Sequence, residues 1–407
     1  MHRVVITGIG AYSAIGSTWQ EAETSLRTLK NRVRRMDAWD AYDGLHTRLG
    51  SPVDFNSPEH FTRKATRSMG RVSLMATAAS EIALRDSGLL DDPVLKSGRV
   101  GIAYGSSSGS TDAITDFANM LISKRVDGIT ATSYIRMMGH TAPVNVGVYF
   151  GLKGRVITTS SACTSGSQGI GYAYEAIRNG YQDIMLAGGG EELCPTQAAV
   201  FDTLYATSTR NHEPEATPRP FDKDRDGLVI GEGACTLILE RRDLALGRGA
   251  KIYGEIVGFD SNSDGQHVTQ PSPETMRAVM ELAIENAGLH SKAIGYVSAH
   301  ATATYLGDIA ESHATLRVFG ENIPISSLKS YTGHTLGACG ALESWLAVEM
   351  MNHGWFMPTV NLQNIDPACA SLDYIVGAGR ELDVEYVMNN NFAFGGINTS
   401  LIFRRHV

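Results

Sequence analysis

Residues 156–166 read VITTSSACTSG and place Cys163 between a predicted strand and a predicted helix. The apolar pair at 156–157 indicates the strand. The helix is indicated by apolar residues that recur on one helical face: Ile170, Tyr174 and Ile177. Free backbone N–H groups and the positive end of the helix dipole at such a junction stabilise a thiolate, the nucleophilic form of cysteine. The segment therefore predicts covalent catalysis by sulfur, with a small buried structural cysteine as the alternative.

Short apolar strands and apolar-faced helices alternate on both sides of this junction. The predicted strands are Val4–Ile6, Val100–Ala103, Asp183–Ala187, Thr236–Leu239 and Leu401–Phe403. The first of these is expected to enter a turn at Gly8. The predicted helices are Arg71–Asp86, Gly169–Asn179, Met276–Ala287 and Ala341–Asn352. This alternation predicts an α/β fold around a largely buried sheet.

The region after residue 332 resembles the region around Cys163 in form. Residues 161–180 and 333–354 each contain a small-residue turn, then an apolar helix, then a closing glycine. Two similar halves that bring helix N-termini to one centre would explain why candidate catalytic residues occur in both.

Composition narrows the class of protein. The chain has 407 residues, 43% of them hydrophobic and 19% charged, and a net charge of −8, which argues against a nucleic-acid binder. The five cysteines are scattered with no CxxC pair, so we do not expect a structural zinc site. Their odd number and scatter indicate a protein from a reducing compartment. The charge-free stretch 156–174 is too polar to span a bilayer, and the N-terminus lacks a signal-peptide core. We expect a cytoplasmic protein that binds neither membranes nor nucleic acid.

Two histidines and a lysine lie in positions that suit catalysis. His300 follows the apolar run 294–299, and ligands bind at strand ends in open α/β sheets. His334 lies between the predicted strand 323–326 and a helix, with Lys329 five residues before it among small residues. Together with Cys163 they form a much stronger set than any one of them alone.

Several motifs, taken in order, resemble one family. They are VVITGIG at 4–10, SSAC at 160–163, AGGGEELC at 187–194, RPFDKDRDG at 219–227, GEGA at 231–234, the His300 motif, Lys329 with Gly333-His334, and FGGIN at 394–398. The chain resembles the β-ketoacyl-acyl-carrier-protein synthases, condensing enzymes of the thiolase fold, over essentially its whole length. The synthase I/II branch is the nearest match.

The resemblance implies a fold and a domain division. It implies a thiolase-like fold in which two similar α/β halves form a five-layered α-β-α-β-α core. The N-terminal half, 1–250, would carry the nucleophilic cysteine, and the C-terminal half, 251–407, the two histidines and the lysine. It implies no cofactor and no metal, because substrates arrive on the phosphopantetheine arm of an acyl carrier protein.

The resemblance also implies a mechanism. Cys163 would take an acyl group from a carrier thioester. His300 and His334, as neutral imidazoles, would polarise the malonyl carbonyl while carbon dioxide leaves. Backbone N–H groups of Cys163 and Phe394 would hold the oxyanion. The two-carbon extension would serve type II fatty acid or polyketide synthesis.

Further site residues follow from the same resemblance. Lys329 would pair with an acid that orders the site, and Glu311 matches that acid. The residues expected to bind substrate are Thr302, Thr304, Phe392, Gly395 and Gly396. The residues expected to dock the acidic carrier protein are Arg63, Lys64, Arg67, Lys124 and Arg125. The other expected partner is a second ketosynthase chain, in a homodimer or in a heterodimer with a chain-length factor.

Three alanines depart from the family pattern. Ala301 and Ala303 replace glycines after His300, and Ala393 replaces a glycine in the gating loop; alanine tolerates positive φ poorly. This motivates the hypothesis of a specialised synthase, in a type II polyketide or aryl-polyene-like pathway. Less favoured alternatives are a thiolase, which needs a second active-site cysteine, and an inactive partner subunit, which would lack Cys163.

Overall fold

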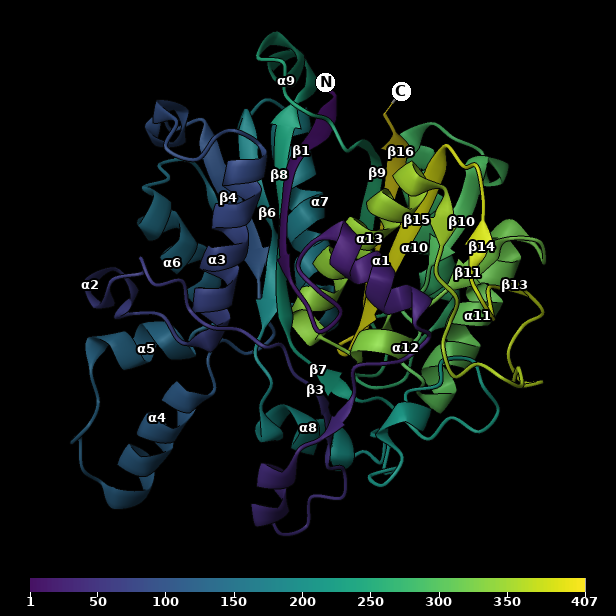
Figure 1. Cartoon of the computed structure of the whole chain (residues 1–407), viewed down its shortest axis with the longest axis horizontal. Coiled ribbons are helices and arrows are strands. Elements are labelled where there is room, and N and C mark those ends of the chain that lie inside the picture. Colours follow the sequence, from purple (N-terminus) through teal and green to yellow (C-terminus); the bar gives the residue numbers. More distant parts are fainter. Residues whose placement is uncertain (407) are drawn as a thin grey trace.

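One mixed sheet of eleven strands forms the framework of the protein (Figure 1). The structure is a computed structural model that describes residues 1–406. In sheet order, the first five strands are β5 (Val156–Thr158), β4 (Val100–Gly105), β6 (Ile184–Glu191), β8 (Gly233–Arg241) and β1 (Val4–Tyr12). They continue as β9 (Gly254–Ser263), β16 (Ile397–Arg405), β15 (Tyr386–Ala393), β10 (Ile294–Ser298), β11 (Pro324–Ser326) and β13 (Asp373–Tyr374).

The two halves of the sheet repeat one pairing pattern. In the first half β5, β4 and β6 are parallel neighbours, and β8 and β1 follow antiparallel. In the second half β11, β10 and β15 are parallel, and β16 and β9 follow antiparallel. Antiparallel pairing of β1 with β9 joins the halves. The internal similarity of the sequence therefore corresponds to a repeated topology.

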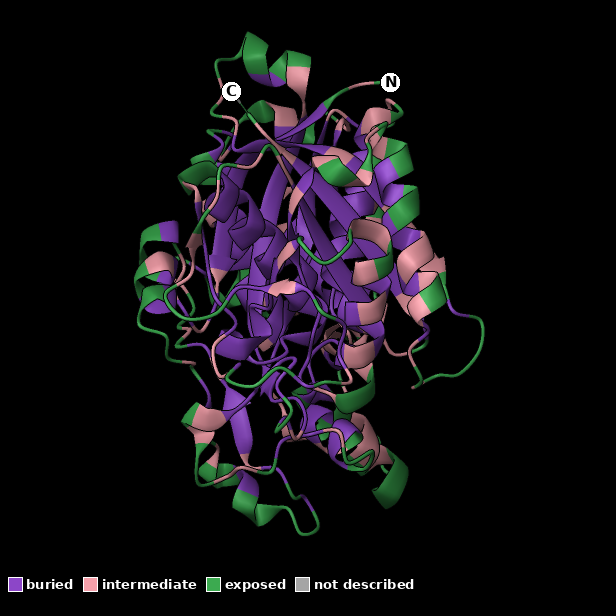
Figure 2. Cartoon of the chain, turned by 90° about the vertical axis from the view of Figure 1, so that its right-hand side faces the viewer, coloured by how far each residue is buried: buried purple, intermediate pink, exposed green. Residues whose placement is uncertain are grey.

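Helices cover both faces and fill the middle. On the first half pack α3 (Arg71–Asp86) and α6 (Thr141–Phe150). On the second half packs α10 (Pro273–Ala287), with α11 (Tyr305–Phe319) against α10. Between the halves lie α7 (Ser165–Arg178) and α13 (Cys339–His353), which are buried along with most of the sheet (Figure 2). The thiolase-like α/β fold predicted from the sequence is confirmed.

The remaining elements are short and mostly peripheral. The helices are α1 (Trp19–Arg27), α2 (Arg63–Thr66), α4 (Asp112–Ser123), α5 (Ala131–Met137), α8 (Pro195–Asp202), α9 (Arg242–Gly247) and α12 (Lys329–Thr332). The short strands are β2 (Arg34–Arg35), β3 (Leu49–Ser51), β7 (Ile230–Gly231), β12 (Trp355–Phe356) and β14 (Arg380–Glu381). The 3₁₀ turns are η1 (Asp37–Ala41), η2 (Pro93–Lys96), η3 (Ala162–Thr164), η4 (Pro214–Ala216), η5 (Ser291–Ala293) and η6 (Leu336–Ala338). Over residues 1–406, no helix combines the length and apolar character that a membrane crossing requires.

The turn expected at Gly8 is wrong, because β1 continues through it to Tyr12. A Cβ on Gly8 would lie 2.3 Å from the carbonyl oxygen of Ala83, and one on Gly10 would lie 2.1 Å from that of Ala79. These glycines therefore let α3 pack directly on the strand. The other predicted elements occur with the predicted type.

The two central helices begin in the same way. Each follows a 3₁₀ turn whose first residue has a positive φ, +53° at Ala162 and +45° at Leu336. A Cβ on Gly166 would lie 2.9 Å from the carbonyl oxygen of Gly337, so the helix starts nearly touch. Cys163 lies at this meeting point.

Candidate active site

Cys163 lies in the middle of η3, directly before α7, and is 4% exposed. It lines a cavity of about 560 Å³ that both histidines also line. The thiol is thus held at the junction of strand, turn and helix that the sequence indicates.

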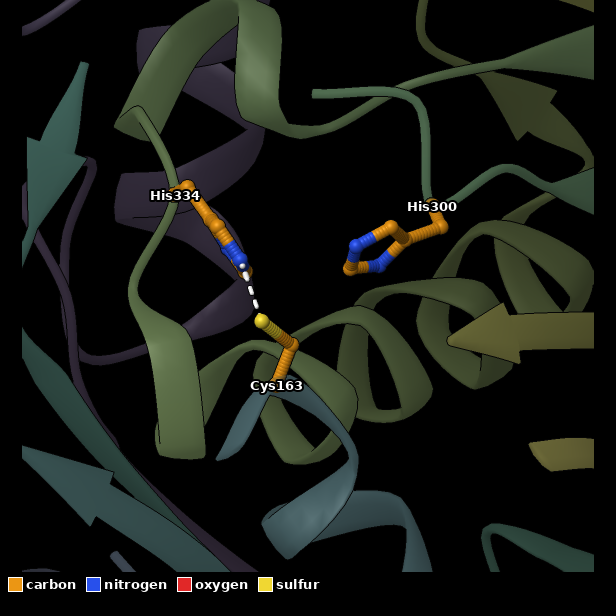
Figure 3. A group of neighbouring side chains, drawn as sticks. All are labelled: Cys163, His300 and His334. Atoms are coloured by element: carbon orange, nitrogen blue, oxygen red, sulfur yellow. Dashed lines mark hydrogen bonds between the residues drawn. The ribbon is translucent and has the colours of Figure 1, made fainter. Parts of the chain in front are cut away.

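Both candidate histidines face the sulfur (Figure 3). Nε2 of His334 lies 2.9 Å from Sγ of Cys163. The rings of His300 and His334 have centroids 5.2 Å apart and an interplanar angle of 88°. His300 follows the end of strand β10, and His334 follows the short helix α12, so two separate segments bring them to the thiol.

Burial keeps both imidazoles neutral. It lowers the pKa of His300 and of His334 well below the ordinary value, and the positive charge of Lys329 lowers both further. At neutral pH each ring therefore carries one hydrogen and no charge.

The expected stabilisation of the thiolate is outweighed in the resting protein. Burial raises the pKa of Cys163 to about 11, against the lowering effects of Lys329 and of the backbone N–H groups of Phe394 and Cys163. The resting nucleophile is therefore a thiol, and the nearest proton acceptor is His334.

The expected pairing of Lys329 with Glu311 is wrong. Nζ of Lys329 bonds instead to Oε1 of Glu343, and both side chains are only 1% exposed. Glu311 uses its carboxylate to accept the backbone N–H groups of His300 (2.8 Å) and Ala301 (2.7 Å). Glu343 lies one turn into α13, where it faces Lys329, whereas Glu311 fixes the loop that carries His300.

The residues expected to bind substrate surround the cavity. Its lining includes Thr302, Thr304, Phe392, Phe394 and Gly396. The two threonine hydroxyls lie 3.0 Å apart, and the ring centroid of Phe392 lies 6.1 Å from that of His300. Gly395 lies beside the lining, at φ +88°.

Only one of the three departing alanines occupies a glycine-like conformation. Ala303 has φ +68°, whereas neither Ala301 nor Ala393 is among the residues with positive φ. The backbone strain predicted for the gating loop at Ala393 is therefore absent, and the strain lies in the loop after His300. Asp308 accepts the backbone N–H of Ala303 at 3.2 Å and helps to hold that turn.

The basic residues expected to dock a carrier protein are accessible. Arg63, Lys64 and Arg67 are exposed on and just after α2, and none of them forms an ion pair within residues 1–406. Lys124 and Arg125 are exposed in the loop after α4, where Arg125 pairs with Asp127.

Comparison with known proteins identifies the family. The model of the β-ketoacyl synthase N-terminal domain matches residues 1–245, and that of the C-terminal domain matches residues 253–363. The chain belongs to the β-ketoacyl synthase family. It is 36% identical to 3-oxoacyl-[acyl-carrier-protein] synthase 2 of Synechocystis, over 99% of this chain and 98% of that one. It is also 36% identical to synthase 1 of Escherichia coli, over 100% and 99%.

Solved structures agree with this placement. A β-ketoacyl synthase from Burkholderia phymatum has 60% identity and a TM-score of 0.99, covering 100% of both chains. The ishigamide ketosynthase/chain length factor has 31% identity and a TM-score of 0.91, again over 100% of both. This β-ketoacyl synthase is thus a condensing enzyme, an acyl-transferring enzyme with the thiolase-like fold.

Three side chains near the thiol were not predicted. Glu343 holds Lys329, Asn391 contacts His300, and Cys339 donates its S–H to the carbonyl oxygen of Cys163 at 3.3 Å. Cys339 does not line the cavity, so it is not placed as the second thiol of a thiolase. For Asn391, the sequence feature that could have indicated a role is the run of three asparagines, 389–391, inside an apolar strand.

Cys163, His300 and His334 are also close enough together to bind a metal ion. Sγ of Cys163 and one ring nitrogen from each histidine lie within 4.8 Å of one another, a set of donors suited to a soft metal ion. The nearby ammonium of Lys329 opposes binding of a cation there.

Proposed function

We propose that this chain is a β-ketoacyl-acyl-carrier-protein synthase. It condenses malonyl-carrier protein with an acyl group held on Cys163, releases carbon dioxide and lengthens the chain by two carbons. The observation that carries the proposal is the convergence of Cys163, His300 and His334 on one cavity, with His334 2.9 Å from the sulfur.

In the first half-reaction the thiol of Cys163 attacks the thioester of an acyl carrier protein. The S–C bond forms as Nε2 of His334 accepts the thiol proton, and the oxyanion lies near the backbone N–H groups of Cys163 and Phe394. The thioester bond to the carrier arm then breaks. His334 returns the proton to the departing pantetheine thiolate, so the step is neutral overall.

In the second half-reaction a malonyl carrier protein occupies the cavity. His300 and His334 donate N–H bonds to the thioester oxygen, which stabilises the enolate as the carboxylate leaves as carbon dioxide. The enolate carbon attacks the acyl-cysteine carbonyl. The new C–C bond forms, the C–S bond breaks, and Cys163 regains a proton from solvent.

Binding of the carrier arm is assigned to the cavity lining. The hydroxyls of Thr302 and Thr304 suit the amides of phosphopantetheine, and Phe392 and Gly396 line the same cavity. We assign docking of the acidic carrier protein itself to five basic residues: Arg63, Lys64, Arg67, Lys124 and Arg125. No cofactor is required for these steps.

A second subunit is the other partner. Apolar side chains are exposed around α4, α5, α6 and the edge strand β5: Leu121, Ile122, Val126, Tyr134, Val148 and Val156. A patch of this kind is typical of a protein interface. We infer a dimer in the cytoplasm, formed either with a copy of this chain or with a chain-length factor. Chromatography with mass measurement of the co-expressed proteins distinguishes the two.

A specialised pathway is the second candidate. Its support is the strained alanine at 303 and the likeness to the ishigamide ketosynthase/chain length factor. Rescue of normal growth in a strain that lacks its housekeeping synthase I would overturn it.

Acyl loading tests the main proposal. The wild type, Cys163→Ala and Cys194→Ser are incubated with a panel of aliphatic and aromatic acyl carrier proteins, and intact masses are measured. Cys194 is the matched control, because it is the one partly exposed cysteine. We expect an adduct on the wild type and on Cys194→Ser and none on Cys163→Ala. Continued loading of Cys163→Ala would refute the nucleophile.

A further inference from the structure

Asn391 lies at the centre of a buried hydrogen-bond network behind His300. The side chain is fully buried in β15. Its Nδ2 lies 2.7 Å from Oε2 of Glu343, 3.4 Å from Nδ1 of His300 and 3.7 Å from Sγ of Cys339. The amide thus connects the ion pair of Lys329 and Glu343 to the histidine.

The orientation of this amide is determined by Glu343. Burial raises the pKa of Glu343, but the charge of Lys329 and the hydrogen bonds from Lys329 and Asn391 oppose this rise. As the ion-pair partner of Lys329, Glu343 accepts hydrogen bonds as a carboxylate. An amide oxygen facing it at 2.7 Å would be repelled, so the NH₂ group faces Glu343 and His300. The amide oxygen faces the other way, where Nδ2 of Asn389 lies 3.5 Å from it.

The orientation of the amide selects the tautomer of His300. Nδ1 of the ring faces an NH₂ group and therefore presents its lone pair. The single hydrogen of the neutral ring is then on Nε2. That nitrogen lies away from Asn391, and His300 lines the cavity shared with Cys163.

His334 differs in this respect. Within the described residues its buried Nδ1 has no hydrogen-bond partner, and its Nε2 faces the sulfur of Cys163. Because the thiol of Cys163 can either donate to this nitrogen or accept from it, no residue among 1–406 holds His334 in one tautomer. The ring of His300 can therefore only donate from Nε2, whereas Nε2 of His334 can either accept or donate a hydrogen bond.

We propose that Asn391 is a positioning residue that holds His300 as the Nε2–H tautomer. His300 is then a permanent hydrogen-bond donor to the enolate oxygen, while His334 accepts and returns the proton of Cys163. This inference rests on the proposed condensation. It also gives the buried pair of Lys329 and Glu343 a role, because the carboxylate orients Asn391.

The test compares the same substitution at two adjacent buried asparagines. Asn391→Leu removes the donor to His300. Asn390→Leu is the control, because Asn390 is equally buried but bonds to Met280 and Ser400. Each protein is assayed separately for acyl loading of Cys163 and for carbon dioxide release from malonyl carrier protein. The ¹⁵N shifts of His300, assigned with His300→Ala, report which ring nitrogen bears the hydrogen.

We expect Nε2–H in the wild type and in Asn390→Leu and a mixture of tautomers in Asn391→Leu. Decarboxylation by Asn391→Leu falls by about tenfold or more, the effect of one lost hydrogen bond, while loading changes by less than about threefold. Asn391→Ser, whose hydroxyl can donate to Nδ1, recovers part of the rate and replaces the leucine variant if that one does not fold.

Two outcomes would overturn the role of Asn391. One is a wild-type His300 with its hydrogen on Nδ1. The other is an equal loss of loading and decarboxylation in the position 391 variants, or no loss of either. A wild type that loads acyl groups but releases no carbon dioxide from malonyl carrier protein would instead overturn the proposed condensation, and the tautomer would still be measured.

Discussion

Three side chains supply the proposed chemistry, and their surroundings set their protonation. Burial and the charge of Lys329 keep His300 and His334 neutral, and burial keeps Cys163 a thiol. Neutral imidazoles donate hydrogen bonds without a positive charge that solvent would have to stabilise. The two histidines are therefore needed most where negative charge develops on the malonyl oxygen.

Replacing either histidine should separate the two half-reactions. We expect His300→Ala and His334→Ala to lower carbon dioxide release by about 10²–10³, the usual cost of one lost donor to a developing oxyanion. Acyl loading should fall less, most clearly in His300→Ala, because only His334 contacts the thiol. Labelled acyl transfer and labelled carbon dioxide release measure the two steps. Complete and equal loss of loading in both variants would contradict these roles.

At the scale of elements, loops and helix ends carry the site. The loop after β10 holds His300, Thr302 and Thr304, and its turn is fixed by Asp308 and Glu311 from α11. The short helix α2 projects its basic residues into solvent, separate from the cavity. One element thus positions substrate groups, and the other offers charge to a partner.

The strain in this loop can be measured with two alanines. Ala301 and Ala303 are both buried, but only Ala303 has a positive φ. We expect Ala301→Gly to destabilise the fold more than Ala303→Gly by about 1–2 kcal/mol, because glycine relieves the left-handed conformation only at 303. Denaturant unfolding of both variants gives the difference. Equal losses would show that Ala303 is not strained.

Charge reversal on α2 should weaken docking of the carrier protein without changing the chemical steps. We expect Arg63→Glu combined with Lys64→Glu to raise KM for acyl carrier protein by about tenfold at low salt, with less effect at high salt and little change in kcat. Lys292→Glu, an exposed lysine on the second half, is the control. A KM that does not change, or that changes equally in the control, would remove α2 from the docking surface.

At the scale of the molecule, the two halves meet at the starts of α7 and α13. Glu191, at the end of β6 in the first half, bonds the backbone N–H of Gly337 in the second at 3.0 Å and that of Ser107 at 2.7 Å. Its carboxyl is fully buried, and burial raises its pKa to about 7 despite these donors. The junction of the halves thus contains a titrating group.

This carboxyl should make stability depend on pH. The folded-state pKa of Glu191, about 7, lies above that of an unfolded glutamate, so its contribution is full below about pH 4.5 and is lost as pH rises towards 7. We expect the free energy of unfolding to fall between pH 5 and pH 8 by up to about 3 kcal/mol more in the wild type than in Glu191→Gln. Denaturant unfolding at both pH values measures it. The same slope in both proteins would exclude Glu191 as the source.

Local patterns predicted most elements, because apolar periodicity reports which side of a segment is buried. The bounds of α3 are those expected, and the turn that contains Cys163 lies where small residues follow an apolar pair. The turn predicted at Gly8 does not form, because this glycine is needed for close packing against Ala83 of α3, 75 residues later in the chain. The division at residue 250 and the catalytic roles stay predictions until tested.

Pairings across the centre could not be read from the chain. Glu311 and Glu343 both lie within 20 residues of Lys329 in the sequence, and both are buried. Only the packing of α13 shows that Glu343 is the acid in contact with Lys329. Asn391 could not be assigned to His300 without the parallel pairing of β10 and β15. Burial raises the pKa of Cys163, and no local motif shows that this thiol is buried.

By itself, the sequence determined the alternation of strands and helices, the family and the side chains able to do the chemistry. These depend on residue type and spacing, which are local properties. The tertiary structure decided which acid holds Lys329, which residue faces His300, where backbone strain lies and whether the thiol is ionised. Those outcomes depend on desolvation and on distances between segments far apart in the chain, and both arise only when the two halves pack together.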